Sequence, residues 1–222
     1  CYTFSDELME EWDWKETQSE GSAVLEYVDF VATKFDLRRD IQFDTWVEEA
    51  RYDEATQRWT VETNRGDRAT ARFLICASGA LSTANMPNYE GIEGFAGEVY
   101  HTGQWPQEPV SFEGKRVAVM GTGSSGIQSI PEIAKTADHV TVLQRTAQFA
   151  FPAGNRELTD EDRAQARKDW DKTKAMMVAH AGGFPHEGND KAGMDYTEEE
   201  RVAHWNKLWE RGSFYFFLDG YN

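Results

Sequence analysis

Gly121-Thr122-Gly123-Ser124-Ser125-Gly126 is the most informative stretch of this 222-residue chain. It follows the apolar run Arg116–Met120 and precedes a second apolar run, Val140–Leu143. A strand, a glycine-rich turn that opens a helix, and a second strand form the unit that binds a dinucleotide pyrophosphate. The three glycines permit a tight turn, a close approach of the phosphates and close packing of the helix on the strand. The sequence therefore predicts a dinucleotide site at the N-terminus of that helix.

The end of the second strand selects between the two nicotinamide dinucleotides. NAD-specific sites usually carry Asp or Glu there, because a carboxylate accepts a hydrogen bond from the ribose 2′-hydroxyl. This chain carries Arg145 and Thr146 instead. A guanidinium binds a phosphate through two parallel hydrogen bonds, so we expect NADP(H), with both residues at the 2′-phosphate. The alternative is that Arg145 is an ordinary solvated arginine of the surface.

The composition of the chain limits the classes of protein to which it can belong. The chain is 40% hydrophobic and 13% aromatic, which is enough apolar material for a core. Its 39 acidic and 23 basic side chains give a net charge of −16, which argues against nucleic acid and anionic membranes as partners. No apolar run has the length of a transmembrane helix. The two cysteines, Cys1 and Cys76, are far apart, so we expect no disulfide and a cytoplasmic location.

Hydrophobic periodicity predicts the elements before the glycine-rich turn. Ser22 is expected to cap a helix that ends near Leu37. Alternating apolar residues predict an antiparallel meander with strands at residues 41–47, 59–63 and 69–73. The apolar run Leu74–Ala77 is expected to form a strand that enters a sheet core and ends at Ser78-Gly79.

Charged helices are expected after Pro152, one of them with a capping box formed by Thr197 and Glu200. The fold class is therefore α/β, with two Rossmann-like dinucleotide-binding domains, an antiparallel meander and a helical insertion. Both domains are incomplete in this chain, because an isolated half-sheet would expose unpaired edges. The chain begins at Cys1 and ends at Asn222 without a natural-looking terminus, so we expect it to be a piece of a longer polypeptide.

A second motif lies directly before the dinucleotide unit. Residues 95–106 read FAGEVYHTGQWP and match the pattern FxGxxxHxxxW(P/D) at five positions: Phe95, Gly97, His101, Trp105 and Pro106. This motif resembles the fingerprint of type I Baeyer–Villiger monooxygenases. The stretch at residues 73–79 is similar to that family too. The stretches at residues 27–32 and 35–38 are similar to it as well, particularly to its phenylacetone and steroid monooxygenase branch. The resemblance covers nearly the whole chain and is weakest over residues 155–195.

The resemblance implies two cofactors, FAD and NADP(H), and divides the chain accordingly. Residues 1–80 would end the first FAD-binding segment, residues 81–114 would form a linker, residues 115–150 would begin the NADP domain, and residues 151–222 would be its helical insertion. The family pattern places Ala77, Ser78 and Gly79 at FAD, with Val47 at its adenine end. It places the following residues at NADP: Gly121, Thr122, Gly123, Ser124, Ser125, Gly126, Ile127, Gln128, Arg145 and Thr146.

The activity implied by the resemblance is the insertion of one oxygen atom of O₂ next to a ketone carbonyl, giving an ester or lactone. His101 is expected to couple NADP binding to domain position rather than to transfer protons. The catalytic Asp and active-site Arg of the family are absent from these 222 residues, so no catalytic residue is assigned and the chain alone is expected to be inactive. The expected partners are a small ketone, O₂ and the remainder of the same polypeptide. Ala80 departs from the Gln of close relatives, and the active-site shape there is expected to differ.

Two alternative functions stay open. One is a flavin-containing or N-hydroxylating monooxygenase, which Trp105-Pro106 argues against. The other is a non-catalytic NADP-binding module, which the missing sheet strands argue against.

Three further groups of residues have side chains that could form a site. No metal is expected at His180, His186, His204, Glu187 and Asp190, because their spacing fits no metal motif. Ser124 and Ser125 lack the G-x-S-x-G elbow of a nucleophile. An aromatic set could line a substrate pocket or form the core of the insertion, and packing is favoured; its members are Trp205, Trp209, Phe214, Tyr215, Phe216 and Phe217.

Overall fold

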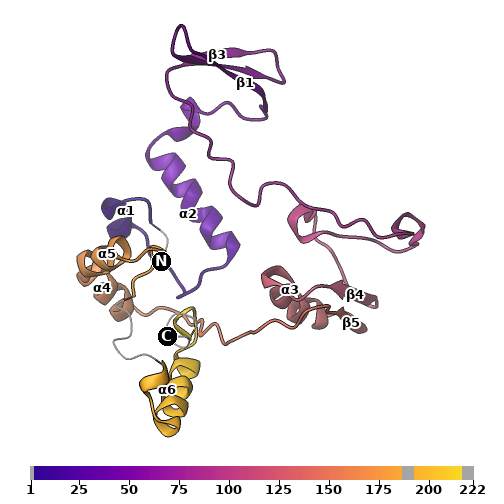
Figure 1. Ribbon diagram of the computed structural model, residues 1–222, viewed down its shortest axis with the longest axis vertical. Coiled ribbons are helices and arrows are strands. Elements are labelled where there is room, and N and C mark those ends of the chain that lie inside the picture. Colours follow the sequence, from indigo (N-terminus) through magenta and orange to yellow (C-terminus); the bar gives the residue numbers. More distant parts are fainter. Residues whose placement is uncertain (1–2, 187–192, 217–222) are drawn as a thin grey trace. The chain divides into compact units, whose positions relative to one another are not determined.

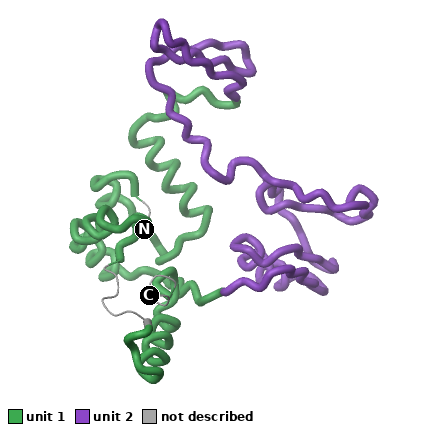
Figure 2. Tube along the Cα trace, viewed as in Figure 1, with its two compact units in different colours: residues 1–44, 150–222 green, residues 45–149 purple. Residues whose placement is uncertain are grey.

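The computed structural model describes residues 3–186 and 193–216. The chain divides into two compact units (Figure 2). One unit is continuous and comprises residues 45–149. The other is assembled from both ends of the chain, residues 1–44 and 150–222. The domain boundaries expected from the sequence stay a prediction.

The continuous unit contains the expected dinucleotide element. Strand β4 (Arg116–Met120) leads through the glycine turn into helix α3 (Ser124–Ala134), and strand β5 (His139–Leu143) follows. The two strands are parallel, in register from Arg116 opposite His139 to Met120 opposite Leu143. Helix α3 packs against both strands and buries Ile133. This order of elements confirms the strand–turn–helix–strand prediction.

The same unit contains the antiparallel meander, in the order β1 (Val47–Asp53), β2 (Arg58–Thr63) and β3 (Arg68–Ala71) (Figure 1). The rings of Tyr52 and Trp59 lie opposite each other across β1 and β2, with centroids 5.2 Å apart. The predicted strand at residues 41–47 is wrong, because β1 only begins at Val47. Asp44 has a left-handed backbone (φ 52°), which interrupts the extended conformation that the alternating residues suggested.

The predicted strand at Leu74–Ala77 is also wrong: residues 73–79 have no regular structure. A strand is stabilised by hydrogen bonds to a neighbouring strand, and none of the strands in the described residues pairs with this run. Ile75 is accordingly 87% exposed.

The second unit is helical. Helices α1 (Asp6–Glu11) and α2 (Gly21–Lys34) come from the beginning of the chain, and α4 (Asp160–Lys168), α5 (Trp170–Ala179) and α6 (Glu198–Arg211) come from its end. The core comprises Leu8, Trp14, Tyr27 and Val31, with Leu158 packed against it. Short 3₁₀ helices complete the regular structure of the two units: Leu37–Asp40, Ile92–Gly94, Thr102–Gln104 and Gly193–Asp195.

Helix caps explain where these helices begin. The predicted capping box of Thr197 and Glu200 is confirmed, and Thr159 forms another with Asp162 at α4. Ser22 is not the N-cap of α2; the N-cap residue is Glu20, two residues earlier, and its side chain forms no capping hydrogen bond. No helix in the described ranges combines the length and the apolar character that crossing a bilayer requires.

Direct contacts join the two ends of the chain in the helical unit. The backbone N–H of Leu158 donates to the carbonyl of Lys15 (2.7 Å), and that of Thr17 donates to the carbonyl of Arg156 (3.0 Å). Asp6 forms an ion pair with Lys174 (2.8 Å). The segment that leaves the dinucleotide element is therefore held by the first twenty residues.

Candidate functional site

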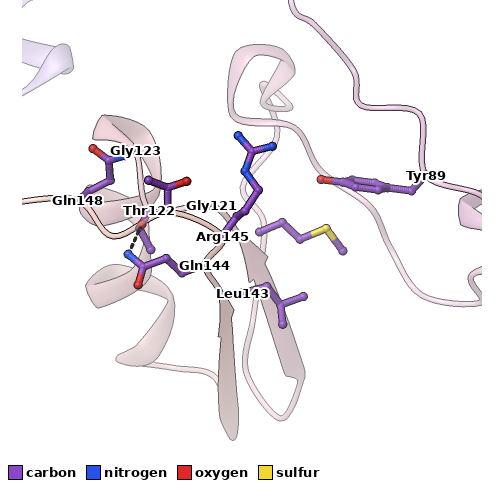
Figure 3. A pocket seen from close by; sticks show the side chains of 10 residues that line it. Tyr89, Gly121, Thr122, Gly123, Leu143, Gln144, Arg145 and Gln148 are labelled. Carbon is purple, nitrogen blue, oxygen red and sulfur yellow. Dashed lines mark hydrogen bonds between the residues drawn. The ribbon is translucent and has the colours of Figure 1, made fainter.

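A cavity of about 820 Å³ opens at the carboxyl ends of β4 and β5 (Figure 3). This is the end at which parallel α/β sheets bind their ligands. Ten residues line it: Tyr89, Met120, Gly121, Thr122, Gly123, Leu143, Gln144, Arg145, Thr146 and Gln148. All of them belong to the continuous unit. The volume lies within the range of small-ligand and cofactor sites.

The glycine turn has the geometry that each glycine was expected to supply. Gly121 has a φ of +98°, which side chains rarely adopt, and its N–H donates to the carbonyl of Leu143 (2.8 Å). A Cβ added to Gly126 would collide with the carbonyl oxygen of Gly121 and lie 3.1 Å from its carbon. Helix α3 can therefore pack this close to the turn only with glycine at position 126.

Gly123 leaves the N-terminus of α3 accessible. It is the N-cap residue, no side chain caps the helix, and a Cβ added to Gly123 would meet no atom within 4 Å. The first N–H groups of a helix lack partners within the helix and favour a negative charge. The backbone at this end of the cavity therefore fits a pyrophosphate.

The lining also includes Arg145 and Thr146, directly after β5. None of the ten lining residues is Asp or Glu, so the guanidinium of Arg145 gives the lining a net positive charge. A positively charged lining without a carboxylate suits an additional phosphate rather than a ribose hydroxyl. The residues present thus fit NADP(H).

The structure brings together half of the residues predicted for NADP. Gly121, Thr122, Gly123, Arg145 and Thr146 line the cavity. The other half lie outside its lining, on the first turns of α3: Ser124, Ser125, Gly126, Ile127 and Gln128. There Gln128 donates to the carbonyl of Ser124 (2.7 Å), which fixes its side chain on the helix.

Half of the lining was not predicted. Met120, Leu143 and Gln144 adjoin the predicted residues in the sequence, so their position beside the turn could have been inferred from strand register. Gln148 follows two residues after Thr146. Tyr89 gave no signal, because it lies in an irregular segment more than thirty residues before the turn (Figure 3).

The five fingerprint residues do not line the cavity. The Phe95 ring occupies the space beside Gly97, where an added Cβ would lie 2.5 Å from it. The Nδ1 atom of His101 accepts a hydrogen bond from the N–H of Gly103 (3.1 Å) and so begins a 3₁₀ turn. Trp105 follows that turn, and its ring lies 5.6 Å from that of Tyr100. In the described residues the motif thus fixes the local path of the chain. Pro106 is the last residue of the motif.

An ion pair attaches the fingerprint segment to β4. Glu98 contacts Lys115, the residue before the strand. Lys115 holds the pKa of Glu98 below its ordinary value, and the Tyr100 hydroxyl contributes in the same direction by donating to the carboxylate. Burial and the bond to Glu98 raise the pKa of Tyr100. The segment with His101 is therefore tied to the strand that ends at the glycine turn.

The residues predicted for FAD are exposed. Val47 is the first residue of β1, beside a register irregularity, and is 60% exposed. Ala77, Ser78 and Gly79 lie in the irregular segment after β3. Gly79 has a φ of +77°, and an added Cβ would meet no atom within 4 Å. This open backbone leaves room for a ligand to approach.

None of the other sequence candidates that the structure describes lines this cavity. The described residues contain no group of three or more potential metal-ligating side chains, and Glu187 and Asp190 lie outside the described ranges. In the aromatic set, the ring of Phe216 lies 5.7 Å from Trp209 and 5.8 Å from Phe151. Phe217 also falls outside the described ranges.

Comparison with known proteins finds relatives that match nearly the whole chain. The model of the flavin-binding monooxygenase-like family matches residues 2–153. The chain is 42% identical over 218 residues to a cyclohexanone 1,2-monooxygenase of Acinetobacter sp, covering 98% of this chain and 40% of that protein. It is 38% identical over 223 residues to a phenazine N-monooxygenase of Lysobacter antibioticus, covering 99% of this chain and 40% of that protein.

A solved structure of a monooxygenase is also similar to the chain in its three-dimensional fold. The structure of an oxidized steroid monooxygenase bound to NADP matches with a TM-score of 0.92 and 45% identity, covering 100% of this chain and 42% of that one. The chain thus spans about 40% of the length of the relatives that it matches. These findings confirm the predicted family resemblance and the predicted α/β, Rossmann-like fold class.

Proposed function

The chain belongs to the flavin-binding monooxygenase-like family, and on that premise we propose that it is part of an FAD- and NADPH-dependent Baeyer–Villiger monooxygenase. The proposed reaction inserts one oxygen atom of O₂ beside the carbonyl of a small ketone and yields an ester or lactone. The ketone is supported by the name of the cyclohexanone 1,2-monooxygenase relative. The remainder of the enzyme would lie in further sequence of the same polypeptide, in the cytoplasm.

The observation that carries the proposal is the cavity that joins the glycine turn to Arg145 without any carboxylate in its lining. The N–H groups at the N-terminus of α3, after Gly123, would hold the pyrophosphate, and Arg145 with Thr146 would hold the 2′-phosphate. The cofactors supply the redox chemistry when bound, as hydride from NADPH and oxygen activation by the reduced flavin. The residues of this chain bind and orient them.

We further propose that the backbone of Ala77, Ser78 and Gly79, with Val47, contacts FAD. The exposed backbone at Gly79 supports this assignment. His101 would couple NADP(H) binding to domain position. The support for that role is the ion pair between Glu98 and Lys115, which ties the segment of His101 to β4.

The test uses the complete polypeptide that carries this chain, supplied with FAD, NADPH, cyclohexanone and ¹⁸O₂. The expected product is a lactone with one ¹⁸O atom, formed with one equivalent of NADPH oxidised, and mass spectrometry detects it. The same experiment is repeated with a panel of other cyclic and linear ketones. Oxidation of NADPH while cyclohexanone and every ketone of the panel remain unchanged would contradict the proposal.

A second candidate function is N-oxidation. It is favoured by the 38% identity to the phenazine N-monooxygenase, which spans 99% of this chain. The same ¹⁸O₂ experiment with phenazine in place of the ketone separates the two functions. A labelled phenazine N-oxide without any lactone would select this second candidate.

A further inference from the structure

Gln144 connects the end of β5 directly to the glycine turn. Its Nε2 atom donates a hydrogen bond to the Thr122 hydroxyl (2.7 Å), across 22 residues of sequence, and Figure 3 shows this bond between the strand end and the turn. Thr122 lies between the first two glycines of the turn. Gln144 lies directly before Arg145.

A second hydrogen bond accompanies this one. The N–H of Gly121 donates to the carbonyl of Leu143 (2.8 Å), which continues the parallel pairing of β4 and β5 by one step. The turn is therefore held to the end of β5 by a backbone bond at Gly121 and a side-chain bond at Thr122. Only the second bond depends on the identity of a side chain.

We propose that Gln144 is a positioning residue that fixes the spacing between the pyrophosphate-binding turn and the 2′-phosphate-binding Arg145. The inference rests on the proposed NADP(H) site. A ligand with both phosphate groups must match that spacing, whereas a ligand with one of them does not. Fixing two subsites in advance favours the ligand that occupies both, because less order has to be imposed upon binding.

The proposal predicts a selective loss of affinity. In the complete polypeptide, Gln144→Leu removes the hydrogen bond without adding charge. We expect affinity for NADP⁺ to fall roughly threefold to tenfold, as for the loss of one hydrogen bond. Affinity for NAD⁺, which lacks the 2′-phosphate, and for adenosine 2′-monophosphate, which lacks the pyrophosphate, should change less than twofold. Isothermal titration calorimetry measures all three ligands on one protein preparation.

Variants on the other side of the bond provide an independent measurement. Thr122→Val removes the acceptor and should reproduce the pattern of Gln144→Leu, whereas Thr122→Ser keeps the hydroxyl and should restore NADP⁺ affinity. The matched control is Gln165→Leu, because Gln165 on α4 also donates its amide to a side chain, that of the C-cap residue Asp169 (2.6 Å), outside the cavity. It should leave all three affinities unchanged.

The outcomes separate the inference from the proposed function. Equal losses for all three ligands would show a general loosening of the turn and overturn the inference, as would unchanged NADP⁺ affinity in both Gln144→Leu and Thr122→Val. A wild-type protein that does not prefer NADP⁺ to NAD⁺ would instead contradict the proposed cofactor site itself.

Discussion

Arg145 should decide the choice of cofactor. Arg145→Ala removes the cationic side chain of the cavity lining. A hydrogen-bonded charge pair contributes about 1.5–3 kcal/mol, so NADPH should bind roughly tenfold to a hundredfold more weakly. NADH, which has no 2′-phosphate, should bind as it does to the wild type. The Michaelis constants for both cofactors check this. Unchanged constants for both would identify Arg145 as a solvated surface residue, and an equal loss for the two would contradict its place at the 2′-phosphate.

Gly126 and Gly123 should respond differently to the same substitution. Gly126→Ala forces a Cβ against the carbonyl of Gly121, so α3 must move and the melting temperature should fall. Gly123→Ala meets no protein atom within 4 Å, so the fold should be unaffected while NADP(H) affinity falls. Thermal melting together with cofactor titration distinguishes them. A Gly123→Ala protein with normal affinity would argue that the pyrophosphate lies elsewhere.

The residues of the site were predictable where the motif fixes local geometry. The positive φ of Gly121, the close approach at Gly126 and the position of Arg145 all follow from short-range sequence. Tyr89 was not predictable, because its place in the lining depends on the path of an irregular segment, which carries no periodicity. The role inferred for Gln144 needed the observed hydrogen bond to Thr122.

Among the elements, α4 should have an N-terminus whose stability depends on pH. Asp162 accepts hydrogen bonds from the Arg156 guanidinium (2.6 and 2.8 Å) and from the N–H of Thr159 (2.9 Å), which hold its pKa well below the ordinary value. A lowered pKa stabilises the folded state above the pKa of the unfolded carboxyl, near about pH 4. That stabilisation is lost as the pH falls toward the folded pKa.

Asp162→Asn should therefore destabilise α4 at pH 7, and the difference from wild type should shrink below about pH 4. Amide hydrogen exchange of α4, followed by mass spectrometry over that pH range, measures it. Glu161→Gln is the control, because it changes a neighbouring acidic residue of the same first turn outside the capping box. A difference that stays constant with pH would rule out the ionised carboxylate as the cause.

Elements with local signals were predicted better than elements that need distant partners. The capping box of Thr197 and Glu200 and the glycine turn depend on residues within a few positions, and both were found in the structure. Leu74–Ala77 has the composition of a buried strand but no neighbouring strand among the described residues. Composition indicates that a segment is suited to a sheet, whereas the hydrogen bonds of a strand require a neighbouring strand.

At the scale of the whole molecule, the helical unit should unfold as one body although its sequence is discontinuous. Tyr27 is 1% exposed, and its hydroxyl accepts a hydrogen bond from the N–H of Phe4 (3.1 Å). Tyr27→Ala should cost about 3–5 kcal/mol, as for other buried aromatic residues, and Tyr27→Phe about 1 kcal/mol. Because Leu158 packs on the same core, Tyr27→Ala should also accelerate hydrogen exchange in α4. Unchanged exchange there would mean that the two ends of the chain fold separately.

The 222-residue chain on its own should expose more apolar surface than a self-sufficient domain. Parallel sheets normally have several strands and are covered on both faces. In the described residues β4 and β5 form a sheet of two strands, which pair only with each other. Leu81 and Phe149 are each 94% exposed. We therefore expect the isolated chain to self-associate in sedimentation experiments and to bind a hydrophobic dye more strongly, per mole, than a longer polypeptide that contains it. A monomeric isolated chain with weak dye binding and full NADP⁺ affinity would favour the non-catalytic NADP-binding module, because the cavity at Arg145 would then need nothing beyond these residues.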